Sequence, residues 1–234
     1  MRLFFAHSDK NPHGWGMMYE KNSSIIVREP KKASASTLLE KIMTGLPPQK
    51  TLLAHIRYAT VGTIKKENCH PFRASDISGR VWTMIHNGTI YSGTGTYRYF
   101  KQQSGDTDSE RLFMAFMDKI NDRLGRGELS ERERFALVSE FTAEHAPRNK
   151  LNLMLYDGDL LYVHKNMKNT LSCKKFESGL LFTTVPLDND GWTPMPMAQL
   201  VAYRNGSEVY RGERHKGVFI PTLEYITALD AMNI

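Results

Sequence analysis

The sequence predicts an α+β domain whose sheets are mostly antiparallel. Strand-like and helical segments are mixed before Pro147, and after it the pattern changes to short strands paired around Asp-Gly and Asn-Gly dipeptides. Such pairs indicate hairpins, whereas a doubly wound parallel sheet would show strands and helices in regular alternation. Because the 234 residues contain no internal repeat and no linker-like segment, we expect residues 1–234 to form a single domain.

Three strands are predicted in the first part of the chain. Residues 24–29 and 51–57 are rich in β-branched and apolar residues over the length of a strand, and a helical pattern lies between them. Residues 81–85 form the third run of this kind. The His86-Asn87-Gly88 that follows predicts a turn at the end of this strand, with backbone amides pointing outward.

Two capping boxes predict the starts of two amphipathic helices. Thr107 is expected to cap the first, with the Glu110 side chain reaching back to it, and apolar residues then recur on one face as far as Leu124. A second box at residues 130–133 opens a helix that runs to about His145.

The later part of the chain predicts two hairpins. Strands at residues 151–156 and 160–164 flank an Asp-Gly dipeptide. Strands at residues 199–203 and 208–210 flank an Asn-Gly dipeptide in the same way.

Composition and charge argue against several classes of protein. No run approaches the roughly 18–20 apolar residues that span a bilayer, and the N-terminus lacks the layout of a signal peptide. The net charge of +6 comes from scattered basic pairs rather than one stripe, so we expect neither a nucleic-acid nor a membrane partner. Cys69 and Cys173 form no disulfide framework and no zinc motif. A cytoplasmic protein without a bound metal is the expectation.

Four short segments combine turn residues with polar groups that core packing explains poorly. They are Pro12-His13-Gly14-Trp15-Gly16, Ala54-His55-Ile56-Arg57-Tyr58-Ala59-Thr60, His86-Asn87-Gly88-Thr89-Ile90 and Thr107-Asp108-Ser109-Glu110. Singly, each is weak evidence, because Asn-Gly is usually only a turn and Thr-x-x-Glu usually only a helix cap.

Together, in this order and at these intervals, the segments resemble the class II glutamine amidotransferases. Asn68-Cys69-His70-Pro71-Phe72 adds a fifth match, and the forms of the motifs are most similar to the YafJ-type branch, which also holds γ-glutamyl hydrolases of glutathione and ergothioneine metabolism. The resemblance implies an N-terminal-nucleophile hydrolase fold, a four-layer αββα sandwich of two mostly antiparallel sheets. It also implies an amidohydrolase that acts on glutamine or a γ-glutamyl compound without a cofactor.

The resemblance further implies how the substrate is held. Arg57 would bind the α-carboxylate, a task that suits a planar guanidinium because its fork meets both oxygens at once. Asp108 would pair with the α-ammonium, and Thr60 and His70 match positions that line the glutamine pocket. The alternatives are a surface cation beside a strand for Arg57 and an acidic residue in the first turn of a helix for Asp108.

Asn87 and Gly88 match the oxyanion hole of the family, where a side-chain amide and a backbone N–H stabilise the developing negative charge. A plain Asn-Gly turn is the alternative for this pair. Trp15 would close the pocket wall, or fill the core between its two neighbouring glycines.

The chain departs from the family at the nucleophile. In the family this is an N-terminal cysteine whose own α-amino group acts as the base. Here Arg2 is the second residue, and the segment after it is similar to one that lies further inside family members, so we expect the first strand and its cysteine to be missing. Cys69 is rejected as a substitute because an internal cysteine lacks the free amine, and Cys173 is expected to be a strand residue.

Several hypotheses therefore stay open. A missed upstream start, a truncation or a natural pseudoenzyme would each explain the missing cysteine. The protein is then either an amidohydrolase or amidotransferase domain or a non-catalytic protein that binds glutamine or a γ-glutamyl small molecule. A separate synthase or peptidase subunit is a possible partner, and an open sheet edge would invite pairing with another chain, including a homo-oligomer.

Overall fold

Antiparallel strand pairing organises the chain. The computed structural model describes residues 1–91, 95–223, 225 and 227. Within them the strands are β1 (Trp15–Glu20), β2 (Ser24–Glu29), β3 (Leu53–Ile56), β4 (Phe72–Ser75), β5 (Val81–Thr89), β6 (Lys150–Tyr156), β7 (Leu161–His164), β8 (Ser172–Phe176), β9 (Gly179–Thr183), β10 (Thr193–Pro194), β11 (Val201–Arg204) and β12 (Ser207–Arg211). They form a six-stranded sheet of order β12-β11-β7-β6-β5-β4 and two three-stranded sheets of orders β2-β1-β3 and β10-β8-β9.

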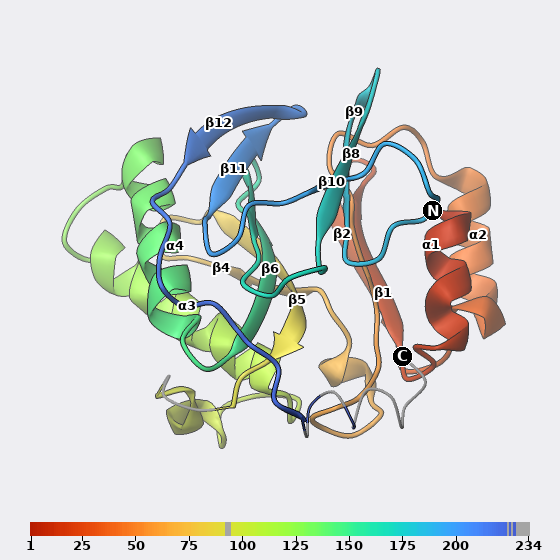
Figure 1. The fold of residues 1–234 in the computed structure, drawn as a ribbon, viewed down its shortest axis with the longest axis horizontal. Coiled ribbons are helices and arrows are strands. Elements are labelled where there is room, and N and C mark those ends of the chain that lie inside the picture. The colour runs from red at the N-terminus through yellow and green to blue at the C-terminus, as the bar shows by residue number, and fades with distance from the viewer. Residues whose placement is uncertain (92–94, 224, 226, 228–234) are drawn as a thin grey trace.

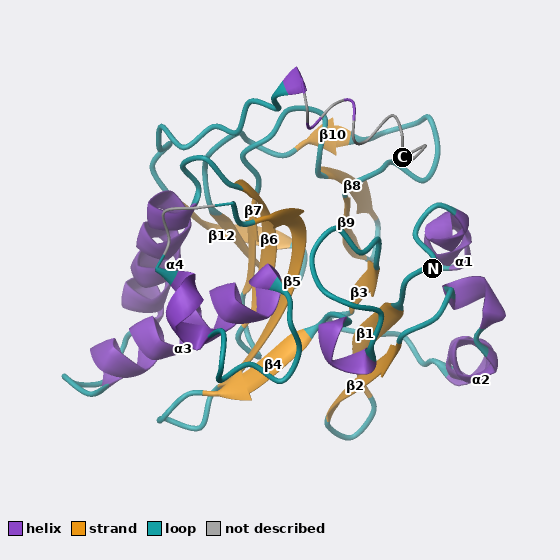
Figure 2. Cartoon of the chain, turned by 90° about the horizontal axis from the view of Figure 1, so that it is seen from below, coloured by secondary structure: helices purple, strands orange, loops and turns teal. Residues whose placement is uncertain are grey.

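Helices flank these sheets on two sides. The α-helices of the described residues are α1 (Arg2–Ala6), α2 (Thr37–Gly45), α3 (Asp108–Leu124) and α4 (Glu131–His145), and short 3-10 helices are η1 (His7–Asp9), η2 (Ala33–Ala35), η3 (Lys66–Asn68) and η4 (Thr96–Tyr99). Helices α3 and α4 cover one face of the six-stranded sheet, and α1 and α2 lie outside β1 and β2 at the opposite end of the molecule (Figures 1 and 2). Of the described helices, none has both the length and the apolar composition needed to cross a membrane.

Buried side chains fill the spaces between four layers. The core between α3, α4 and the six-stranded sheet includes Trp82, Phe116 and Phe141. A second cluster, with Phe5 and Trp15, lies between α1, α2 and the β2-β1-β3 sheet. Two smaller clusters join the six-stranded sheet to the facing sheets. The predicted α+β sandwich of antiparallel sheets between helices is thereby confirmed.

The sheet layer that faces the six-stranded sheet is divided into two parts. Strand β3 ends the β2-β1-β3 sheet and β9 ends the β10-β8-β9 sheet, and the two sheets lie beside each other in Figure 2. A cavity of about 210 Å3 is lined by residues of both edge strands. The sequence predicted two sheets, whereas the structure has three because this layer is not continuous.

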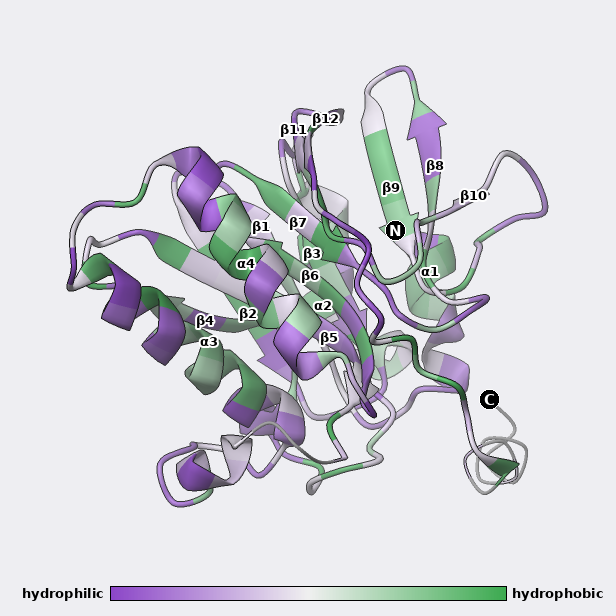
Figure 3. Cartoon of the chain, turned by 60° about the vertical axis from the view of Figure 1, so that its left-hand side comes forward, coloured by the Kyte–Doolittle hydropathy of each residue, from purple (hydrophilic) through white to green (hydrophobic). Residues whose placement is uncertain are grey.

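The hairpins and helix starts follow local sequence rules closely. Strands β6 and β7 pair around Asp157-Gly158, and β11 and β12 pair around Asn205-Gly206. Helix α4 begins with both halves of its capping box formed. Hydrophilic and hydrophobic residues are interspersed along α3 and α4 (Figure 3), and buried residues of both helices belong to the core over the six-stranded sheet.

Two local predictions are wrong in detail. Strand β5 does not end at Ile85 but continues to Thr89, so Asn87 and Gly88 lie inside a strand instead of a turn. Thr107 caps α3, but the Glu110 side chain does not reach back to Thr107. It accepts hydrogen bonds from the backbone N–H groups of Ser104 at 2.8 Å and Gly105 at 2.7 Å.

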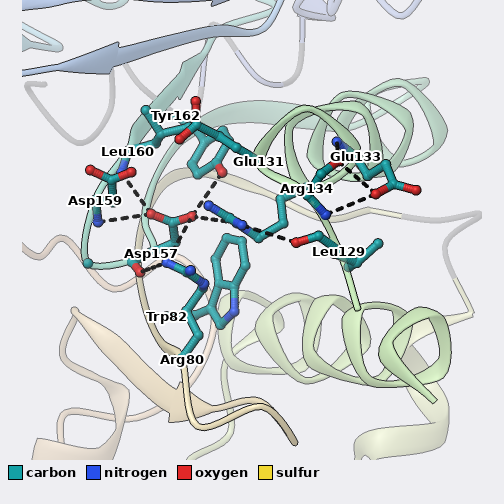
Figure 4. A network of polar contacts seen from close by, with 12 residues as sticks. Arg80, Trp82, Leu129, Glu131, Glu133, Arg134, Asp157, Asp159, Leu160 and Tyr162 are labelled. Carbon is teal, nitrogen blue, oxygen red and sulfur yellow. Dashed lines mark hydrogen bonds and ion pairs between the residues drawn. The ribbon is translucent and has the colours of Figure 1, made fainter. Parts of the chain in front are cut away.

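A buried carboxylate joins the six-stranded sheet to α4 (Figure 4). The Asp157 side chain is 0% exposed, and its Oδ2 accepts hydrogen bonds from Arg134 Nε at 3.1 Å and from the Tyr162 hydroxyl at 3.0 Å. Its Oδ1 accepts from the backbone N–H groups of Leu160 at 2.7 Å and Asp159 at 3.0 Å. Burial and the neighbouring carboxylate raise the pKa of the Tyr162 phenol, which keeps it protonated as a donor.

We predict that Asp157→Ala lowers the free energy of unfolding by about 3–5 kcal/mol, because Arg134 would stay buried without its counter-ion. Glu140→Ala is the control: its carboxylate pairs with Lys119 but is 71% exposed, so its loss should cost less than about 1 kcal/mol. Urea unfolding of both variants measures the difference. Equal stability losses in the two variants would contradict the role given to Asp157.

Candidate functional site

A cavity of about 770 Å3 opens between the ends of β3 and β5, the start of α3 and the segment that follows residue 215. The six residues singled out in the sequence all line it: Arg57, Thr60, His70, Asn87, Gly88 and Asp108. They come from four segments that are far apart in the chain. The structure therefore brings the whole predicted set together around one cavity.

Arg57 follows directly after β3 and is only 3% exposed. Its Nη2 donates hydrogen bonds to the carbonyl oxygens of Val61 at 2.9 Å and Gly62 at 3.3 Å, so the loop that follows holds one side of the guanidinium. Its Nη1 is buried and has no hydrogen-bond partner in the described part of the protein. A buried cationic donor without an acceptor is costly, which favours an anionic ligand at this position.

A polar latch fixes the loop that holds Arg57. We use this name for Thr63, Asn68 and Asp106. Asp106 Oδ2 accepts from the Thr63 hydroxyl at 2.8 Å, and its Oδ1 accepts from the Thr63 N–H at 3.0 Å and from the Asn68 side-chain amide. Asn68 Oδ1 in turn accepts from the Asp106 N–H at 2.8 Å. The loop after Arg57 is thereby joined to the residue just before Thr107, the cap of α3.

Asp108 is the first residue of α3 and is 5% exposed. Its Oδ2 accepts from the Ile90 N–H at 2.6 Å, and its Oδ1 accepts from the Ser109 N–H at 2.9 Å. The alternative noted in the sequence, an acidic residue in the first turn of a helix, thus describes part of what Asp108 does. The same carboxylate lines the cavity and keeps the end of β5 against the start of α3.

Asn87 and Gly88 lie where β5 pairs with β6, opposite Asn152 and Leu151. A Cβ added to Gly88 would come within 1.9 Å of the Lys150 carbonyl oxygen and 2.3 Å of His86 Nε2, so only glycine fits. The Leu151 N–H donates to Asn166 Oδ1 at 2.8 Å, and the Leu151 carbonyl oxygen lies 2.9 Å from His164 Nδ1.

Three histidines line the cavity, of which His70 and His86 are buried and His55 is half-buried. The rings of His55 and His70 are 4.2 Å apart between centroids, and both nitrogens of His70 lack hydrogen-bond partners among the described residues. His86 is bonded through Nδ1 to the Ser109 hydroxyl at 2.9 Å and through Nε2 to the Lys150 carbonyl oxygen at 3.1 Å. Burial lowers the pKa of all three imidazoles, so they are neutral at pH 7.

Other residues considered in the sequence lie elsewhere or at the rim. Thr60 lines the cavity but is exposed. Trp15 is 0% exposed in the core under α1, which is the core alternative given for it. Cys69 is 0% exposed, packs beside Gly14 and does not line the cavity, and burial raises the pKa of its thiol to about 11. Cys173 lies on β8.

The sequence patterns missed some residues that matter to this site. Asp106 carries no motif signal of its own, and its place in the latch depends on tertiary contacts. Lys150, at the start of β6, and Arg148 just before it also line the cavity. Among the described residues, no group of three or more His, Cys, Asp or Glu side chains is arranged to hold a metal ion.

With this geometry established, comparison with known proteins defines the class. A family model for class-II glutamine amidotransferases matches residues 4–176, and the chain belongs to this family. It is 27% identical over 229 residues to a putative glutamine amidotransferase of Haemophilus influenzae, across 87% of this chain and 76% of that protein. It is 29% identical over 154 residues to the putative glutamine amidotransferase YafJ of Escherichia coli, across 63% of this chain and 58% of that protein.

A solved structure supports the same fold. The crystal structure of a predicted glutamine amidotransferase from Pseudomonas aeruginosa PA01 matches with a TM-score of 0.61 at 21% identity, over 85% of this chain and 87% of that one. The family inferred from the five sequence motifs is thus confirmed. The roles of the individual site residues stay predictions, to be tested by experiment.

We predict that Gly88→Ala destabilises the protein by about 1–3 kcal/mol, because the added methyl group overlaps backbone that cannot move without breaking the β5–β6 pairing. Gly45→Ala is the control, since nothing lies within 4 Å of a Cβ added there. Thermal unfolding followed by circular dichroism compares the two. A Gly88→Ala protein as stable as Gly45→Ala would show that the backbone around Gly88 is less crowded than the structure indicates.

Proposed function

We propose that the cavity binds the glutamyl part of glutamine or of another γ-glutamyl amide and polarises its side-chain carbonyl. The observation that carries this proposal is that a buried guanidinium without an ion-pair partner, a carboxylate and the Asn87-Gly88 pair near the end of β5 line one cavity. Amino-acid substrates carry a carboxylate and an ammonium group at one end. A site that binds both groups needs one positive and one negative side chain at a fixed separation.

Arg57 is proposed to bind the α-carboxylate. Its Nη2 is held by the loop carbonyls, while Nη1 faces no protein acceptor in the described residues. A carboxylate oxygen placed against Nη1 would form a charge-assisted hydrogen bond in a site shielded from water. The α-ammonium is proposed to bind Asp108, whose oxygens already accept backbone N–H groups and retain further lone pairs for a charged donor.

Asn87 and Gly88 are proposed to bind the γ-carbonyl oxygen. Asn87 and Gly88 both line the cavity. Two donors on one oxygen would stabilise negative charge as an amide is attacked, which is the largest electrostatic contribution in acyl-transfer sites. Neutral histidines behind them bring no competing positive charge at pH 7.

For the 234-residue chain we propose binding without turnover. Cleavage in this class of enzyme uses a cysteine thiolate with a free α-amine as its base. Both cysteines of the sequence are described, and neither lines the cavity. Burial raises the pKa of Cys69 to about 11, which leaves almost no thiolate at neutral pH. The proposed activity of the site is therefore substrate recognition and carbonyl polarisation, and a catalytic thiol would have to be supplied beside it.

Calorimetry with glutamine tests the recognition directly. Arg57→Ala should weaken binding about 100-fold and Arg57→Lys about 10-fold, because lysine keeps the charge but loses the fork. Arg132→Ala, an exposed residue on α4, is the matched control and should stay within about twofold. Ammonia release should be undetectable in each protein. Glutamine affinity that is absent in the unsubstituted protein, or unchanged in Arg57→Ala, would overturn the proposal.

The latch gives a second prediction. Asp106→Ala removes the acceptor for Thr63 and Asn68, so the loop that holds Arg57 should become more mobile and glutamine binding should weaken about 5- to 10-fold. Asp188→Ala is a suitable control because Asp188 also pairs with a lysine and accepts a tryptophan N–H, but does not line the cavity. Hydrogen exchange at residues 58–68 reports the loop. Unchanged exchange and affinity would show that the latch does not position Arg57.

A further inference from the structure

Two cations at one wall of the cavity have no role in binding glutamine. Lys150 and Arg148 both line it, and neither forms an ion pair within the described part of the chain. The Lys150 ammonium contacts only an aromatic face, at 5.8 Å from the centre of the Tyr225 ring. An ammonium group that lines a cavity without an acidic partner is available to bind a ligand carboxylate.

The register of β5 and β6 determines the position of Lys150 relative to Asn87 and Gly88. Asn87 pairs with Asn152 and Thr89 pairs with Lys150 across β5 and β6. Residues two apart on a strand point to the same face, and so do directly opposed residues, so Asn87 and Lys150 share the face that lines the cavity. Their positions differ by two residues along the strand, or about 7 Å.

Arg148 is held beside Lys150 by a fixed turn. Its backbone has a φ of 65°, a left-handed conformation that an arginine rarely adopts. The turn is closed by the Asn149 N–H, which donates to the Ala146 carbonyl at 3.1 Å, and the Asn149 side chain accepts from the Tyr91 N–H at 2.7 Å. Arg148 is exposed, so it lies at the mouth of the cavity while Lys150 lies deeper.

We propose that Lys150, supported by Arg148, binds a carboxylate on the amine half of the substrate, so that the site prefers γ-glutamyl amides of amino acids to glutamine itself. This inference rests on the proposed function and specifies its substrate class. In such an amide the second carboxylate lies just beyond the amide nitrogen, on the side away from the α-carbon of the glutamyl part. With Asn87 and Gly88 on the γ-carbonyl, this carboxylate points along the strand toward Lys150.

Size and electrostatics agree with this assignment. A cavity of about 770 Å3 lies in the range that encloses drug-sized ligands, about 300–1,000 Å3, which are larger than one amino acid. Burial lowers the pKa of the Lys150 ammonium to about 8, so it is mostly protonated at pH 7 and a bound carboxylate would stabilise that form. The glutamyl clamp and the second carboxylate site would then hold the two halves of the amide separately.

Two small ligands isolate the second carboxylate. γ-Glutamylglycine and γ-glutamylethylamide share the glutamyl part and the amide, but a carboxylate in the first replaces a methyl group in the second. Calorimetry on the unsubstituted protein at pH 7 should give at least about 10-fold tighter binding of γ-glutamylglycine. Lys150→Met, which keeps the length of the side chain, should remove this preference while leaving the ethylamide within about twofold. Lys41→Met, an exposed residue on α2, is the control and should retain the full preference.

The preference should also decrease with pH. Lys150 loses its proton as the pH rises through about 8, so the ratio of the two affinities should fall between pH 7 and pH 10. The charged or titratable groups facing the same region are His86, Tyr91, Asp108, Arg148 and Tyr225. We expect these groups to affect both ligands alike, through the glutamyl and amide parts that the ligands share. In Lys150→Met the ratio of the two affinities should not change with pH, which identifies Lys150 as the titrating group.

The outcomes separate the two proposals. If neither γ-glutamyl ligand nor glutamine binds, the proposed function is wrong. If all three bind with similar affinity, or if Lys150→Met weakens both amides equally, the glutamyl site stands and the second carboxylate site is wrong. Retained ethylamide binding in Lys150→Met shows in the same experiment that the variant is folded.

Discussion

Hydrogen bonds between Asp106 and the loop of residues 61–69 join the two segments that carry Arg57 and Asp108. Arg57 and Asp108 come from separate segments of the chain, one at the end of β3 and one at the start of α3. The cavity that we propose to hold a zwitterion is lined by both side chains. In the latch, the Asp106 carboxylate accepts hydrogen bonds from Thr63, and the Asn68 side chain accepts one from the Asp106 N–H. The positions of the guanidinium and the carboxylate are therefore linked through this latch.

A second constraint is the crowding at Gly88. Here β5 approaches β6 so closely that the Lys150 carbonyl occupies the space of a side chain, and the same carbonyl accepts the His86 Nε2. This bond fixes the neutral His86 tautomer, whose Nδ1 then accepts the Ser109 hydroxyl at the start of α3. The Lys150 carbonyl therefore contacts the Gly88 position on β5 and, through His86 and Ser109, is connected to the start of α3, which carries Asp108. The site is a set of coupled positions more than a set of separate residues.

What the sequence could predict follows from the range of each interaction. Capping by Ser130 and Thr107 and the turns at Asp157-Gly158 and Asn205-Gly206 depend on neighbours within a few residues, and these predictions were confirmed. The Asn87-Gly88 turn was wrong because pairing with β6, more than sixty residues away in sequence, overrides the local preference for a turn. Asp106 and Lys150 show no local pattern at all. Their functions arise from which segments the fold brings together.

The distribution of charge is the physical basis of the proposed recognition without cleavage. Arg57 and Lys150 form no ion pair within 4.0 Å among the described residues, Asp108 is the carboxylate that lines the cavity, and burial keeps the three histidines neutral. This charge pattern complements the ligand that we propose, which has two carboxylates and one ammonium, and its field would also stabilise a developing oxyanion. Burial strengthens electrostatic interactions in the cavity, and burial also raises the pKa of the Cys69 thiol and so suppresses its ionisation. A thiolate fit for attack must therefore stand in the open cavity, next to the carbonyl, and not in the packed loop behind Arg57.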